Sequence, residues 1–287
     1  MCSAIVLALT GCAGGTGENH RKVPLPEKNL EGWVMPLDQF FETDRQSLAG
    51  DYAENLLMKP CMNDAGFEWE PPWRDLQAKG SPSVKEIGIS IFNLSLAEQF
   101  GYGFGPSQDW TTIDQRAWVA RAKELWTPAW QEPWEKCLKA ARKVLPLSRN
   151  TQTANVLYSD AGEAARQRGD VKAAAAAWRK CMQPAGVPDL PEWPYGMPSQ
   201  SISDKYDIDV AQRHDPSEEE IALAVMDANC RDSSGYSKTA YDAEWEEQVK
   251  LLNEHADELV ADKAASNDYW ARSMKVIDEY APSRPAG

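Results

Sequence analysis

The sequence predicts an all-α protein, and two observations carry this prediction. Apolar residues recur in steps of three and four over most of the chain, which is the spacing of one helix face. A motif that ends a helix occurs twice, and a single distant cysteine follows each copy. We therefore expect a helical domain of two pseudo-repeated halves, residues 36–150 and 151–287, with two disulfides and a long C-terminal helix.

Two helices are expected in the first half, over residues 48–61 and 130–145. Each shows apolar side chains on one face and polar side chains on the other. Pro133 lies either near the start of the second helix or at a kink within it, because proline removes one backbone donor.

A third helix is expected after Arg213, where its start is marked by capping residues. Asp215 is the predicted N-cap and Pro216 the first helical residue. The glutamates at 218–220 then complement the positive end of the helix dipole. The helix leads to Cys230.

The C-terminal stretch from Thr239 to Tyr280 has a long helical period. Lys263 and Ser266 interrupt the apolar stripe, so we expect either one long helix or two helices joined near Ala265. Its apolar face packs on the rest of the domain or, less favoured, on a partner helix.

The repeated motif consists of Cys-Met, then Ala-Gly, then Glu-Trp and Pro, over residues 61–71 and 181–194. Gly66 and Gly186 are the expected left-handed caps that end the two helices. An irregular loop rich in tryptophan and proline follows each glycine.

Four cysteines lie beyond the N-terminal region, an even number that fits an oxidising compartment. No pair has the C-x2-C spacing of a zinc site, and no metal or other cofactor is expected. Each motif copy is closed by the next cysteine along the chain, so we predict the pairs Cys61–Cys137 and Cys181–Cys230 among three possible pairings.

The N-terminus is expected to be an export and anchoring signal. Residues 4–9 are apolar and lead into Leu9-Thr10-Gly11-Cys12, which resembles the bacterial lipobox. We expect residues 1–11 to be a truncated lipoprotein signal peptide, because no Lys or Arg precedes the apolar run. Cys12 would carry the lipid, residues 12–35 would form a tether, and the protein would lie on the extracytoplasmic face of the cell membrane. The alternative is the apolar end of a cytosolic chain.

The chain resembles a broad set of secreted or lipid-anchored actinobacterial proteins to which no activity is attached. The resemblance implies export, disulfides and helical content, and it brings no catalytic residues. It is carried by the lipobox at Cys12, Pro36-Leu37-Asp38, Cys61-Met62 with Gly66-Phe67, Phe100-Gly101-Tyr102-Gly103, Ala177-Trp178-Arg179-Lys180-Cys181-Met182 and Ala224-Val225-Met226-Asp227-Ala228-Asn229-Cys230-Arg231.

Composition argues against nucleic acid as a partner. The chain has 30 Lys and Arg against 44 Asp and Glu, a formal net charge of -14 that repels a phosphate backbone. The sequence also lacks the Gly-x-Ser-x-Gly, His-Glu-x-x-His and phosphate-loop signatures of common enzymes. We therefore expect a non-enzymatic module that binds an envelope protein, peptide or glycan.

The aromatic loops are the candidate ligand site. Trp69 and Trp73 in the first loop, with Trp193 and Tyr195 in the second, could form one platform, because aromatic faces stack on sugars, peptides and cations. The alternative, which we favour, is that these rings pack as lids over the helix ends.

The rival function is a carboxylate-dependent glycan hydrolase. Glu68, Glu70 and Glu192 flank the loop tryptophans, which is the residue mix of a sugar-cleaving groove. That reading requires two of these carboxylates to face each other across a cleft, about 5–10 Å apart.

Overall fold

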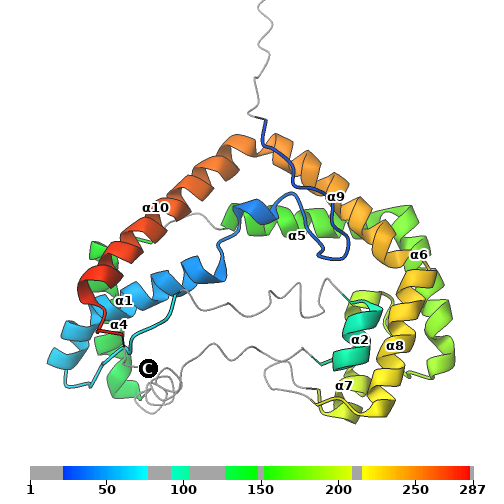
Figure 1. The fold of residues 1–287 in the computed structure, drawn as a ribbon, viewed down its shortest axis with the longest axis horizontal. Helices are drawn as coiled ribbons and strands as arrows, with labels where there is room; N and C mark the ends of the chain where they lie inside the picture. The colour runs from blue at the N-terminus through cyan, green and yellow to red at the C-terminus, as the bar shows by residue number, and fades with distance from the viewer. Residues whose placement is uncertain (1–21, 77–91, 104–126, 148–151, 209–214, 285–287) are drawn as a thin grey trace, which may run out of the picture.

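The computed structural model describes residues 22–76, 92–103, 127–147, 152–208 and 215–284. Within these ranges the regular structure is helical, with α-helices, three short 3-10 helices and one isolated bridge between Asn29 and Val34. The predicted all-α fold class is confirmed. The helices form an arch, in which α9 (Tyr236–Glu254) and α10 (Ala256–Tyr280) are two arms that meet at an apex (Figure 1).

The α10 arm of the arch is a three-helix layer. It contains α1 (Asp44–Asp64), which lies beside α10, and α4 (Pro128–Val144), which packs on α1 (Figure 1). Gly50 lets the Tyr269 ring approach, because a Cβ there would lie 2.8 Å from its Cε1 atom. The close approach of backbone and ring brings α1 and α10 into contact over a shared apolar core.

The α9 arm holds the remaining helices. Here α5 (Gln152–Gln167) and α6 (Gly169–Met182) pack on α9, while α2 (Leu94–Phe100) and α6 pack on α8 (Glu218–Ser233). The short α7 (Gln200–Tyr206) lies at the lower end of this arm (Figure 1). Trp178 and Met182 on α6 are fully buried at the centre of its core.

Both predicted disulfides are present. Cys61–Cys137 joins α1 to α4, and Cys181–Cys230 joins α6 to α8. Each therefore closes within its own predicted half.

The predicted halves nevertheless do not form two separate packed units in the described part of the chain. The C-terminal α10 packs on α1 of the first half, and α2 of the first half packs on α8 of the second. The apolar stripe of α10 is therefore covered within the chain, as the favoured alternative predicts.

The first copy of the repeated motif ends its α-helix as expected, whereas Gly186 in the second copy caps the 3-10 helix η2 (Gln183–Ala185) that follows α6. Gly66 and Gly186 have φ values of 87° and 65°, in the left-handed region. At the first copy, the Gly66 N–H donates to the Asn63 carbonyl and the Phe67 N–H to the Met62 carbonyl, both at 3.0 Å. This pair of bonds is a Schellman cap.

The start of α8 differs from the expectation. Ser217, not Asp215, is the N-cap, and its Oγ accepts a hydrogen bond from the Glu220 N–H at 3.2 Å. The Glu220 side chain accepts in turn from the backbone N–H of Tyr102, which fixes the first turn two residues further along. Pro216 precedes the cap instead of following it.

The C-terminal stretch is two helices, but they join at His255 and not near Ala265. His255 has φ −116° and ψ 19°, between α9 and α10. Lys263 and Ser266 do not interrupt α10, because they bond to the segment before α1. The Lys263 Nζ donates to the Phe41 carbonyl, and the Ser266 Oγ donates to Glu42 Oε1, each at 2.8 Å.

The predicted tether, residues 12–35, is wrong for its described part. Residues 22–37 form a strap that follows α9 (Figure 1). In the strap, Met35 and Leu37 are fully buried, and the Leu37 N–H donates to Gln248 Oε1 on α9 at 3.0 Å. Because the apolar residues at the end of this segment are buried, the segment is part of the core and is not a flexible spacer. Cys12 lies outside the described residues.

In the part of the chain that the structure describes, no helix combines the length and the apolar character needed to cross a membrane.

Candidate functional site

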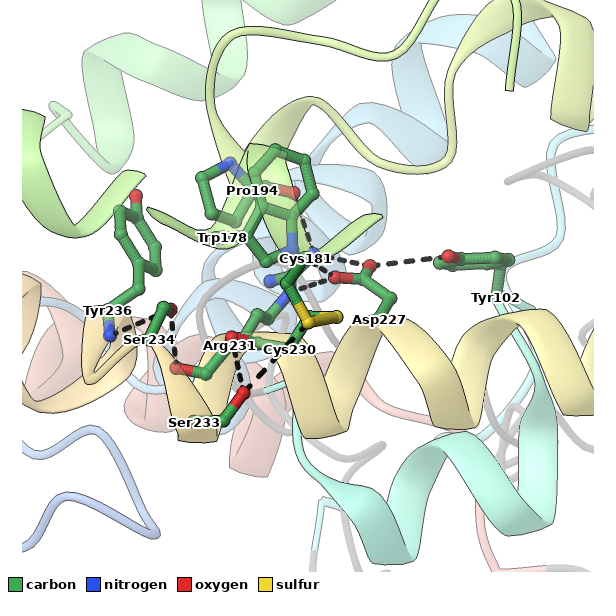
Figure 2. A network of polar contacts seen from close by, with 10 residues as sticks. All are labelled: Tyr102, Trp178, Cys181, Pro194, Asp227, Cys230, Arg231, Ser233, Ser234 and Tyr236. Carbon is green, nitrogen blue, oxygen red and sulfur yellow. Dashed lines mark hydrogen bonds and ion pairs between the residues drawn. A yellow bond between two sulfur atoms is a disulfide. The ribbon is translucent and has the colours of Figure 1, made fainter. Parts of the chain in front are cut away.

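Asp227 is the centre of a buried polar network on α8 (Figure 2). Its carboxylate accepts from Arg231 Nε and Nη2, at 2.9 and 3.0 Å, and from the Trp178 indole N–H at 2.7 Å. The Tyr102 hydroxyl donates to it at 3.3 Å. Asp227 and Arg231 are four residues apart, so they share one face of the helix.

The segment after α2 is held by a second buried carboxylate. Glu220 accepts from the Tyr102 N–H at 2.9 Å, and Gly101 makes this approach possible. A Cβ on Gly101 would lie 2.5 Å from Glu220 Oε1. Burial, followed by the negative charge of Asp227, raises the pKa of Tyr102, so its hydroxyl stays a donor to that carboxylate.

Arg231 links this network to the second aromatic loop. Its Nη2 donates to the Pro194 carbonyl at 2.6 Å, and its guanidinium lies 4.5 Å from the Phe92 ring centroid. The 3-10 helix η3 (Pro194–Gly196), which carries Tyr195, is thereby fixed to α8.

Asp189 closes the base of the same loop. Its carboxylate accepts from the Ser199 Oγ at 2.7 Å, from the Ser201 N–H at 2.9 Å and from the Ser201 Oγ. The hydrogen bonds from Ser201 and then Ser199 lower the pKa of Asp189 to about 2. The loop thus stands between two anchors, Arg231 and Asp189.

A cavity of about 390 Å³ lies between α5, α9 and this loop. We call it the tyrosine–arginine cavity. Pockets of this size hold small molecules, in a range of about 300–1,000 Å³. Its aromatic and charged lining residues are Trp33, Tyr158, Tyr195, Tyr236, Arg166, Arg231 and Glu244.

Tyr236 is the most informative residue of the wall. It is 8% exposed, and its hydroxyl has no hydrogen-bond partner among the described residues. Burial raises the pKa of Tyr236 to about 12, so the hydroxyl remains a donor at neutral pH. Because Tyr236 lines the cavity and no described residue bonds its hydroxyl, that hydroxyl is available to a ligand.

The second aromatic loop contributes to this site and the first does not. Tyr195 lines the cavity, and its ring stacks on Trp193 with a centroid distance of 6.3 Å. Trp193 also lines a neighbouring hollow of about 400 Å³ with Lys172 and Arg179.

Trp69 and Trp73 lie in the other arm of the arch. Trp69 is buried against Trp130, with ring centroids 6.1 Å apart, and the guanidinium of Arg284 lies over the Trp73 ring. The structure therefore does not bring the four predicted rings into one platform. In the first loop, Trp69 packs as a lid over the end of α1.

The carboxylates of the two loops are also apart. Glu68 and Glu70 are exposed in the α1 arm, where Lys59 binds Glu70, and Glu192 is exposed in the α9 arm. They do not face one another across a cleft. Among the described residues, no cluster of His, Cys, Asp and Glu has the arrangement of a metal site.

The sequence reasoning missed Tyr236, Arg166 and Arg231 as site residues. One signal was present, since Asp227 and Arg231 place two charges at helical spacing on the buried face of an otherwise apolar segment. Nothing in the sequence indicated that α5 and α9 enclose a cavity.

Comparison with protein-family models, with curated proteins and with solved structures gives no match to this chain.

The Asp227→Asn variant should be strongly destabilised. Neutralising Asp227 leaves the buried Arg231 charge uncompensated, which costs about 3–5 kcal/mol of unfolding free energy. Urea unfolding followed by circular dichroism would measure it. The control is Asp268→Asn, since Asp268 pairs with Arg272 at the same spacing but is 68% exposed. The control should lose at most about 1 kcal/mol, and equal losses would contradict the role of the buried pair.

Because Asp189 holds the loop through its ionised carboxylate, the stability of the protein should fall as the pH is lowered in the acid range. Its pKa of about 2 lies below the ordinary 3.8, so the folded state favours the carboxylate. The stabilisation is complete above about pH 5 and is lost as the pH falls through the pKa in the folded state. The melting temperature of Asp189→Asn should therefore lie below that of the wild type at pH 6 and converge with it near pH 2. A difference in melting temperature that stays constant from pH 6 to pH 2 would contradict this role of the Asp189 carboxylate.

Proposed function

We propose that the protein is a lipid-anchored, extracytoplasmic module that binds a small molecule in the tyrosine–arginine cavity. The observation that carries the proposal is the hydroxyl of the buried Tyr236, which lines that cavity and has no hydrogen-bond partner among the described residues. The surrounding rings and two arginines supply the apolar surface and the few polar groups that small-molecule sites use.

The wall composition supports binding over chemical conversion. Its lining residues include no His, Cys or Lys, and Glu244 is their single carboxylate. Acid and base chemistry on glycans uses a pair of carboxylates, as in the rival hydrolase function. The proposed role is therefore retention, transport or presentation of a ligand at the cell envelope.

The strap supports the proposed anchoring through Cys12. The strap begins beside the apex of the arch (Figure 1). Nine residues separate residue 22 from Cys12 in the sequence, and this length of chain spans at most about 35 Å. A lipid on Cys12 would thus hold the apex close to the membrane surface, with both arms directed away.

The proposed lipid anchor is tested by removing the thiol of Cys12. Expressed in a bacterial host, the wild type should fractionate with membranes, while Cys12→Ala should be released because one diacylated residue is the proposed attachment. Cys2→Ala is the matched control, since Cys2 lies in the proposed leader and should leave membrane attachment unchanged. Membrane retention of Cys12→Ala would refute the anchor.

The binding role is tested by native mass spectrometry of protein purified from its own membrane. The wild type should carry a bound small molecule, and Tyr236→Phe should retain it about three- to tenfold more weakly, because a single hydrogen bond is lost. Tyr280→Phe is the control, since Tyr280 is exposed at the end of α10. A wild type without a bound mass, or equal retention in both variants, would count against the cavity.

A further inference from the structure

The guanidinium of Arg166, on α5, is held in place, but one of its terminal nitrogens has no acceptor among the described residues. Its Nε and Nη2 donate to Glu163 Oε2 at 3.3 and 2.8 Å, and its guanidinium lies 5.4 Å from the Tyr195 ring centroid. Its Nη1 donates to no described residue.

Arg231, on α8, repeats the arrangement from another side of the cavity. Asp227 binds its Nε and Nη2, and the Pro194 carbonyl accepts from Nη2 as well. The Phe92 ring covers the guanidinium. Its Nη1, like that of Arg166, has no acceptor in the described part of the chain.

The cavity wall therefore holds three hydrogen-bond donors for which the described residues provide no acceptor. Two of the donors are the Nη1 atoms of Arg166 and Arg231, whose guanidinium groups are already held in place. The third is the hydroxyl of Tyr236, and the positive charges of both arginines act on its pKa against the effect of burial. An arginine can donate but cannot accept, so a ligand must bring acceptors. Bound carboxylates and phosphates are the anions that arginine recognises best.

The charges around the cavity favour a ligand with one negative charge over a ligand with two. Glu244 lies in the wall, Asp227 stands behind Arg231 and Glu163 beside Arg166, so the two cations are already largely balanced. The chain as a whole carries a formal charge of -14. A phosphate dianion meets stronger repulsion from these groups than a carboxylate does.

We infer that the tyrosine–arginine cavity binds a small ring compound bearing one carboxylate, which accepts from Arg166 Nη1, Arg231 Nη1 and the Tyr236 hydroxyl. The ring would lie against the apolar wall that Val171, Ala240 and Trp33 provide. This inference rests on the proposed binding function and specifies its ligand class. The carboxylate could belong to a sugar acid or to an aryl acid.

Isothermal titration calorimetry of the full-length, detergent-solubilised protein tests the inference with five probes, of which inorganic phosphate is one. Glucuronate and benzoate represent the two sources of the carboxylate, and glucose and benzyl alcohol are their neutral counterparts. At least one acid should bind about tenfold or more tightly than its neutral counterpart, because charge-assisted hydrogen bonds are lost in the latter. The acid that binds identifies the ring class.

Arg166→Gln should weaken binding of that acid about 10- to 100-fold, since it removes a charged donor. Arg272→Gln is closely matched, because its side chain is 34% exposed against 35% for Arg166. Arg272 likewise pairs with a carboxylate of its own helix and lies over a tyrosine ring, but on α10. Arg272→Gln should therefore leave the affinity unchanged, and circular dichroism of both variants checks that they fold alike.

Four outcomes would overturn the carboxylate inference. They are equal binding of an acid and its neutral counterpart, equal effects of the two arginine variants, binding of inorganic phosphate that is tighter than that of either acid, and no binding of any probe. Native mass spectrometry separates this failure from failure of the proposed function. A neutral or cationic molecule retained through Tyr236 would overturn the ligand class and leave the binding site in place. If nothing is retained and no probe binds, both proposals fall.

Discussion

The buried ion pair between Asp227 and Arg231 is the constraint on which the α9 arm depends. Two charges removed from water need hydrogen bonds from other groups in addition to their mutual attraction. The groups that meet this requirement come from other elements, through the Trp178 indole, the Tyr102 hydroxyl and the Pro194 carbonyl. One pair on α8 therefore fixes α6, the segment after α2 and the second aromatic loop together.

The position of the cavity follows from that constraint. Tyr195 can form part of its wall only because the loop that carries it is fixed at Pro194 by Arg231 and at its base by Asp189. Arg231 is thus both a structural ion-pair partner and a lining residue. This double use explains why the buried network and the tyrosine–arginine cavity adjoin one another.

The arch itself is held by contacts that cross the chain order. The strap before α1 packs on α9, and α10 returns to α1, so the N-terminal segments lie between the two C-terminal helices (Figure 1). Lys263 and Ser266 show how this works in detail, since their polar groups bond to residues 41 and 42 instead of water. Polar residues inside a helical stripe can therefore mark a tertiary contact and need not mark a helix break.

The sequence by itself determined the helical class, the left-handed caps at Gly66 and Gly186, and the pairing Cys61–Cys137 with Cys181–Cys230. These features depend on periodicity, glycine conformation and a short repeat, all of which are local. Only the tertiary structure decided the join at His255, the packing of the strap, and the separation of Trp69 from Tyr195. It also decided which residues line the cavity, because helices distant in sequence meet through side-chain packing that periodicity does not encode.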